Sequence, residues 1–174
     1  MAHRHIAHEF DCSAETFWER LFFVDDYITA LFRDWLKFER WDIVERYDTA
    51  DGLVRVIEAV PPVRDLPGPI KKAMKHGAGY TERGEYFRSQ SLYTVQATPK
   101  SMADKVTVTG EMRVATIAEG RCRRTYDAYV EARIFGVGSL VENKVLDDLV
   151  KSYDKSADFT RRWLIDHGLS TVGS

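Results

Sequence analysis

A long helical pattern near the end of the chain limits most strongly what this sequence can fold into. Residues 139–167 contain neither proline nor glycine, and such a helix would be roughly 40 Å long, so it needs a large partner surface. Serines replace larger apolar residues in the middle of its apolar stripe. These small side chains either leave room beside the helix or let the helix approach its partner closely. Residues recurring at three-to-four spacing form the stripe: Val141, Val145, Leu149, Ser152 or Tyr153, Ser156, Thr160, and Trp163 or Leu164.

Strand patterns earlier in the chain supply the partner surface. Alternation predicts strands at about 80–90, 91–98, 105–118 and 121–134, while Asp51-Gly52 joins residues 41–47 to 53–60 as a hairpin. Ser13 and then Asp25-Asp26 are N-cap candidates for two short helices that follow the first strand. This order predicts an α+β fold of the helix-grip kind, in which a curved antiparallel sheet of about six to seven strands wraps around the long C-terminal helix. The length of 174 residues suits one domain, residues 1–174.

Charge and composition narrow the classes of partner. The net charge is −2, from 25 basic and 27 acidic residues, which gives no preference for nucleic acid, and we expect no nucleic-acid partner. No segment is apolar enough to span a bilayer or to serve as a signal peptide, so we expect a soluble, cytoplasmic protein. Cys12 and Cys122 are far apart in the sequence, and we expect reduced, buried thiols rather than a disulfide framework or a metal-ligand pair.

Two stretches carry a family resemblance. Ile134–Glu142 reads as a strand that enters a glycine-containing turn and a glutamate, and Phe159–Leu164 ends the long helix as Phe-x-x-x-Trp-Leu. These strings resemble the end of START-like helix-grip proteins, the SRPBCC superfamily, especially an uncharacterised bacterial family of polyketide-cyclase-like or lipid-transport-like members. Asp65–Pro67 also fits that layout, whereas the basic run Arg121–Arg124 is not explained by it. The resemblance implies a hydrophobic cavity between helix and sheet that binds lipids, sterols, polyketides or similar molecules.

Alternation along the strands predicts which side chains would line such a cavity. The small residues Gly110, Ala128 and Ala132, opposite Ser152 and Ser156, would create volume without polar demand, and ordinary tight packing is the alternative. The predicted lining consists of Trp41, Ile43, Val56, Glu58, Val108, Met112, Tyr126, Ala128, Val130, Val145, Leu149, Ser152 and Ser156.

Motifs for specific chemistry are sparse. Glu58 is predicted to face inward with Val56 but has no assigned role, and no catalytic residue is identified. His3, His5 and His8 lack a supporting ligand set, so no metal is predicted, and no nucleotide or nucleophile motif indicates a cofactor. The basic run Lys71–His76 either meets phosphate head groups in a transient membrane contact or is a solvated loop face.

Together these observations predict a binding or carrier protein that encloses one hydrophobic small molecule. Residues 61–79 and the turn before the long helix would form the entrance. The alternative is an aromatase/cyclase-type enzyme in which a tyrosine, an arginine or a buried glutamate moves protons in the same cavity. A third hypothesis, a domain that regulates a partner protein, requires an exposed apolar patch.

Overall fold

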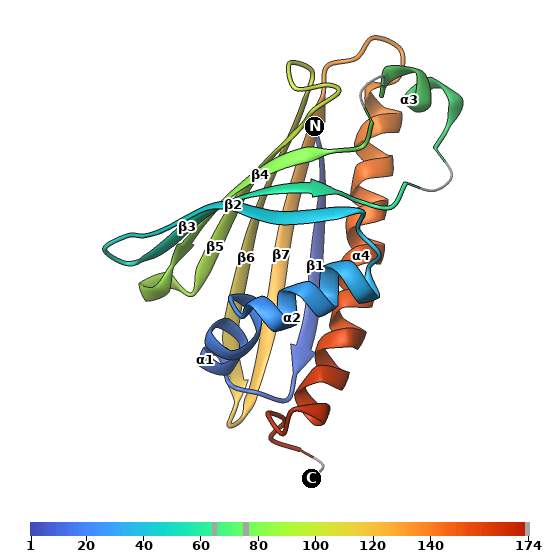
Figure 1. Ribbon diagram of the computed structural model, residues 1–174. Helices are drawn as coiled ribbons and strands as arrows, with labels where there is room; N and C mark the ends of the chain where they lie inside the picture. The colour runs from blue at the N-terminus through green and yellow to red at the C-terminus, as the bar shows by residue number, and fades with distance from the viewer. Residues whose placement is uncertain (64–65, 75–76, 173–174) are drawn as a thin grey trace.

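A single antiparallel sheet of seven strands forms one wall of the molecule (Figure 1). The computed structural model describes residues 1–63, 66–74 and 77–172, without the side chain of residue 73. The spatial order of the strands is β1-β7-β6-β5-β4-β3-β2. Their bounds are β1 (Ala2–Phe10), β2 (Arg40–Asp48), β3 (Gly52–Val60), β4 (Tyr80–Phe87), β5 (Leu92–Pro99), β6 (Val106–Ala118) and β7 (Arg121–Ala132). The predicted α+β helix-grip architecture is confirmed.

Short helices precede and interrupt the sheet, and one long helix ends the chain. Ser13 caps the first of them, as predicted, because its Oγ accepts a hydrogen bond from the Thr16 backbone N–H at 3.0 Å. The bounds are α1 (Ala14–Thr16), continued by π-helical turns (Phe17–Phe22), α2 (Asp25–Thr29), continued likewise (Ala30–Trp35), α3 (Gly68–Ala73), a 3-10 turn (Arg88–Gln90) and α4 (Gly138–Asp166). No helix in the described ranges has the length and apolarity needed to cross a membrane.

The long helix α4 packs on one side of the sheet, against β1 and β7. At its start, the carboxylate of Glu142 accepts the Ala132 backbone N–H at the end of β7, at 2.9 Å. Near its end, the Thr160 hydroxyl lies 2.7 Å from the Tyr27 hydroxyl of α2, and both groups are buried. Strands β2–β4 curve away from β7 and cross in front of the remaining sheet (Figure 1). The sheet therefore has an inner face, turned toward α4 and the short helices, and an outer face.

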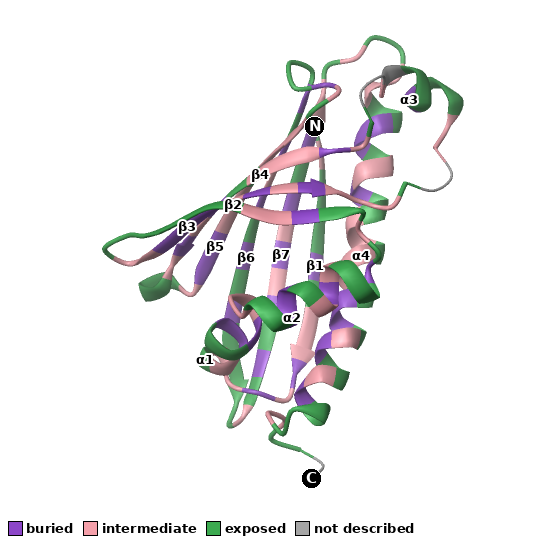
Figure 2. Cartoon of the chain, viewed as in Figure 1, coloured by how far each residue is buried: buried purple, intermediate pink, exposed green. Residues whose placement is uncertain are grey.

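Strand register assigns side chains to these faces. Val108, Met112 and their neighbours at every second position of β6 are buried, and Figure 2 shows this alternation along β6 and β7. In β2 the register shifts between Ile43 and Glu45. This bulge moves Glu45 to the outer face, although strict alternation along the strand would place it on the same face as Ile43.

Candidate functional site

Six polar or phenolic side chains meet on the inner face, and we call them the interior polar cluster. Five of them come from strands, and strand pairing places them on one face. Arg55 lies opposite Gly84, Glu82 opposite Ile57, and Tyr93 opposite Tyr86. The cluster consists of Arg55 on β3, Tyr80 and Glu82 on β4, Tyr93 on β5, Tyr126 on β7 and Tyr153 on α4. Strands and α4 thus converge on one region of otherwise apolar wall.

Glu82 is the carboxylate of this cluster. It holds an inner-face position, and desolvation there raises its pKa, while the charge of Arg55 acts in the opposite direction. Its side chain nevertheless keeps accessible surface. Tyr80 and Tyr153 are likewise only partly buried, and desolvation raises the pKa of each. The three side chains therefore face inward without being fully buried.

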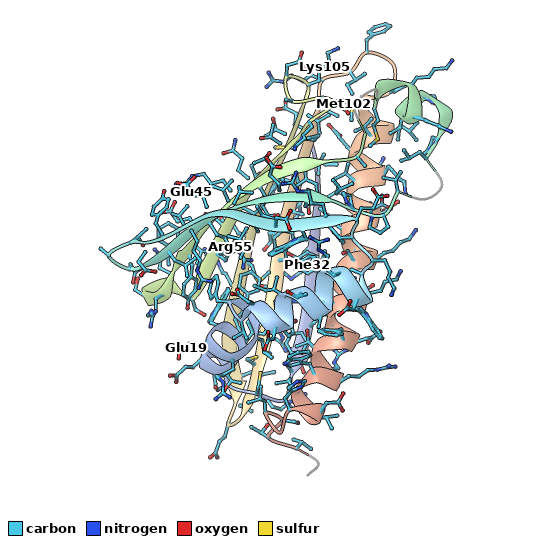
Figure 3. The ribbon with its side chains drawn as sticks, viewed as in Figure 1. Glu19, Phe32, Glu45, Arg55, Met102 and Lys105 are labelled. Atoms are coloured by element: carbon cyan, nitrogen blue, oxygen red, sulfur yellow. The ribbon has the colours of Figure 1, made fainter. Side chains whose placement is uncertain are left out.

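Arg55 is buried, with 3 % of its surface exposed, and is held by aromatic groups. Its Nε donates to the Tyr93 hydroxyl at 2.9 Å and its Nη1 to the Phe22 carbonyl at 3.4 Å. The guanidinium also lies 4.6 Å from the centre of the Phe22 ring. Figure 3 shows Arg55 on the side of the strands that faces the short helices, with Glu45 on the other side. Hydrogen bonds and cation–π contacts offset the cost of burying this charge.

The tyrosines are neutral hydrogen-bonding groups embedded in apolar wall. Burial raises the pKa of Tyr93 to about 12, and it raises the pKa of Tyr126 well above the ordinary value. The rings of Tyr126 and Tyr153 stack with centroids 4.5 Å apart, and their hydroxyls are hydrogen-bonded to each other. These hydroxyls stay protonated at physiological pH.

Two glycines make room for the tyrosine hydroxyls. A Cβ at Gly84 would collide with the Tyr93 hydroxyl, and a Cβ at Gly110 would collide with that of Tyr126. The expected free volume at Gly110 is therefore filled by Tyr126. Ser156 likewise faces Arg124, whose Nη1 donates to its Oγ at 3.1 Å. At both positions the small residue permits close approach, which was the alternative to free volume.

The structure brings most of the predicted lining residues to the interior. Trp41, Ile43, Val108, Met112, Tyr126, Ala128 and Val130 occupy inner-face positions of the strands. On α4, Val145 and Leu149 pack against the core, Ser156 is buried and Ser152 is half-buried. Their contact with a ligand stays a prediction.

Val56 and Glu58 are the exceptions, because they lie on the outer face. Ile57, between them, is fully buried, and the Glu58 carboxylate pairs with Arg40 at 2.7 Å and Lys100 at 3.3 Å. The prediction that they line the interior is wrong. Strand β3 is apolar at nearly every position, so the sequence did not show which alternate residues face inward. A shift of one residue in this assignment turns Glu58 inward and Arg55 outward, the reverse of what the structure has.

Glu82 was missed for a related reason. In β4, polar residues occupy both faces, and Gly84 interrupts the inner one. The glycine itself was the available signal, because glycine inside a strand often marks the close approach of another group.

Sequence comparison places the chain in a family. The model of a family of proteins of unknown function, DUF2505, matches residues 5–164. The chain belongs to this family. No curated protein matches the chain in sequence.

Solved structures show the same architecture at low identity. A norcoclaurine synthase point mutant from Thalictrum flavum, in complex with a transition-state analogue, has 17% identity and a TM-score of 0.65, with 96% of each chain covered. A protein from Thermus thermophilus has 14% identity and a TM-score of 0.61, covering 88% of this chain and 90% of its own. The Zhui aromatase/cyclase from Streptomyces sp. R1128 has 14% identity and a TM-score of 0.57, with 90% of each chain covered. These similarities show that the chain shares the helix-grip fold of these structures.

The basic run of β7 is explained by the two faces of that strand. Arg121 and Arg123 form salt bridges with Glu9 on the outer face. Arg124 is buried, donates to the Tyr153 carbonyl of α4 at 3.2 Å, and leaves its Nε without a partner in the described structure. Arg124 therefore helps to attach α4 to the sheet.

The outer face carries polar features of its own. An open depression of about 470 Å³ has a polar lining that includes Arg83 and Glu85, which pair with each other at 3.4 Å. The Asp127 carboxylate bonds His3 at 3.0 Å and His5 at 2.8 Å. Within the described ranges no cluster of histidine, cysteine and acidic residues is suited to a metal.

The two cysteines meet in the core, although they are distant in sequence. Both are buried and free, and their sulfur atoms are 3.9 Å apart. Of the basic run on the 61–79 segment, Lys71 and Lys72 are exposed on α3, whereas Lys75 and His76 lie outside the described residues, as does Asp65. The membrane contact stays a prediction.

Proposed function

We propose that this protein encloses one small, mainly apolar molecule between the inner face of its sheet and α4, and acts as a binding or carrier protein. The observation that carries the proposal is that Tyr80, Glu82 and Tyr153 face inward and are nevertheless only partly buried. A closely packed interior would leave such side chains no accessible surface. Apolar side chains such as Val95 and Leu149, also only partly buried, complete a wall suited to an apolar ligand.

Native mass spectrometry tests this proposal. Protein purified without detergent is weighed in native and denatured form, and any released molecule is identified. We expect a stoichiometric apolar adduct, or the uptake of one equivalent of an added apolar probe. Protein that stays bare in the presence of a range of apolar probes would contradict the proposal.

A second candidate is an enzyme of the aromatase/cyclase type that uses the same space. The inward carboxylate of Glu82 favours it, because a carboxylate whose pKa is raised is a stronger general base than an ordinary one. The test is to incubate the protein with a short linear poly-β-ketone thioester and to follow the cyclised aromatic product by absorbance. An acceleration that Glu82→Gln abolishes would support this candidate, and a wild-type rate equal to that of buffer would reject it.

A further inference from the structure

Glu82 is the carboxylate of the interior polar cluster, and its hydrogen-bonding capacity is unused among the described residues. Its carboxylate has no hydrogen-bond or ion-pair partner among the residues that the structure describes. Carboxylates on the inner face of a sheet ordinarily have partners, because an unpaired charge that is shielded from water is costly. Glu82 holds an inner-face position, opposite the fully buried Ile57, and its side chain is only partly buried. The carboxylate is therefore available to a molecule that enters the interior.

Four of the neighbouring polar groups, Arg55, Tyr93, Tyr126 and Tyr153, are engaged with one another. Arg55 donates to the Tyr93 hydroxyl at 2.9 Å and lies against the Phe22 ring, and it acts on Glu82 through its charge without an ion pair. The Tyr126 and Tyr153 hydroxyls bond each other. Within the described ranges, Glu82 and the Tyr80 hydroxyl are the two groups of the cluster without a hydrogen bond, and Glu82 is the carboxylate acceptor of the two.

We propose that Glu82 anchors the head group of the enclosed molecule, and that this molecule is mainly apolar and ends in a hydrogen-bond donor, a hydroxyl or an amine, rather than in a carboxylate. An ionised carboxylate only accepts hydrogen bonds, so a donor head group completes it. A carboxylate head group would place two like charges in an apolar interior. This inference rests on the proposed function and adds the ligand class, which excludes fatty acids.

Three probes with one apolar body and different head groups test the inference: phenylbutanol, phenylbutylamine and phenylbutyrate. Their affinities for the whole chain are measured by isothermal titration calorimetry at neutral pH. We expect the alcohol and the amine to bind wild-type protein at least about tenfold more tightly than the carboxylate, since hydrogen bonds to charged groups are among the strong ones. In Glu82→Gln, whose amide both donates and accepts, we expect this preference to fall to about twofold or less.

The matched control is Glu85→Gln, which makes the same change on the same strand. Glu85 pairs with Thr94 in register and with Arg83 on the outer face, so its replacement is expected to leave all three affinities unchanged. Equal binding of the three probes to wild type, or a preference that Glu82→Gln leaves intact, would overturn the inference while the proposed function stands. If none of the probes binds and no native adduct is found, the proposed function fails and the inference fails with it.

Discussion

At the scale of single residues, Glu82 lowers the stability of the folded protein although the proposed function requires it. Its carboxylate is partly buried without a partner among the described residues, and desolvation disfavours its charged form in the folded protein. Selection for folding alone would replace such a residue, whereas a binding role would preserve it. The loss of stability can be measured, because it depends on the charge of the Glu82 carboxylate and therefore on pH.

We predict that Glu82→Gln raises the free energy of unfolding at pH 7, by about 1 kcal/mol or more. The pKa of Glu82 is raised above its ordinary value of 4.5, so the folded state holds the proton more tightly than the unfolded state does. Stability therefore falls as the pH rises from about 4.5 through the raised pKa, and the deficit persists above it. Urea unfolding of wild type and variant from pH 4 to pH 8 measures the difference, which should shrink toward acidic pH.

A gain that is constant across pH would contradict this prediction, because it would not come from the charge. Other titrating groups, such as His8, act equally in both proteins and cancel in the comparison. The partly exposed Glu85→Gln serves as the control and should show no such pH-dependent gain.

Sequence reasoning succeeded where one face of an element is apolar and failed where both faces are mixed. The faces of β6 and β7 follow from Val108, Met112 and Val130, because a clean period of two fixes the phase. In β3 and β4 the phase was hidden, so Arg55 and Glu82 were missed and Glu58 was chosen instead. Pairing between strands, which the sequence does not display, decides such cases. The approach of Cys12 to Cys122 depended on pairing in the same way.

At the scale of elements, glycines in the strands determine how closely the tyrosines lie against the sheet. We predict that Gly84→Ala destabilises the protein by about 1–3 kcal/mol, because the new methyl group would displace the Tyr93 hydroxyl and disturb its bond to Arg55. Gly68→Ala is the matched control, since no atom lies within 4 Å of a Cβ built there. Chemical denaturation measures both. Equal effects of the two substitutions would show that Tyr93 is not constrained by β4.

The contact between α2 and α4 depends on one buried pair of hydroxyls. We predict that Tyr27→Phe lowers the free energy of unfolding by about 1 kcal/mol, because the Thr160 hydroxyl, 2.7 Å away, loses a partner in the core. Thr160 still donates to the Ser156 carbonyl, at 2.6 Å, which limits the loss. Tyr129→Phe, at an exposed tyrosine on β7, is the control and should change stability by less than about 0.5 kcal/mol. A neutral Tyr27→Phe would show that packing alone holds α2 on α4.

At the scale of the whole molecule, one end combines apolar exposure with positive charge. Phe135, in the turn before α4, is fully exposed, and α3 with Lys71 and Lys72 lies at the same end of the molecule (Figure 1). An exposed aromatic side chain near basic residues is the usual composition of a surface that touches anionic membranes. For a carrier, that end would be the place where a ligand enters or leaves.

We predict that Phe135→Ser weakens binding to anionic phosphatidylglycerol vesicles about tenfold, because burying this ring in the membrane interface is worth on the order of 1.5–3 kcal/mol. The substitution should leave stability and the affinity for phenylbutanol unchanged, since Phe135 is exposed in the free protein. Val44→Ser, at an exposed position on β2, removes an apolar side chain from another part of the surface and is the control. Co-sedimentation with vesicles measures the effect. Equal losses of vesicle binding in both variants would mean that the position of an exposed apolar side chain does not matter. Unchanged vesicle binding by Phe135→Ser would show that this end of the molecule does not contact the membrane.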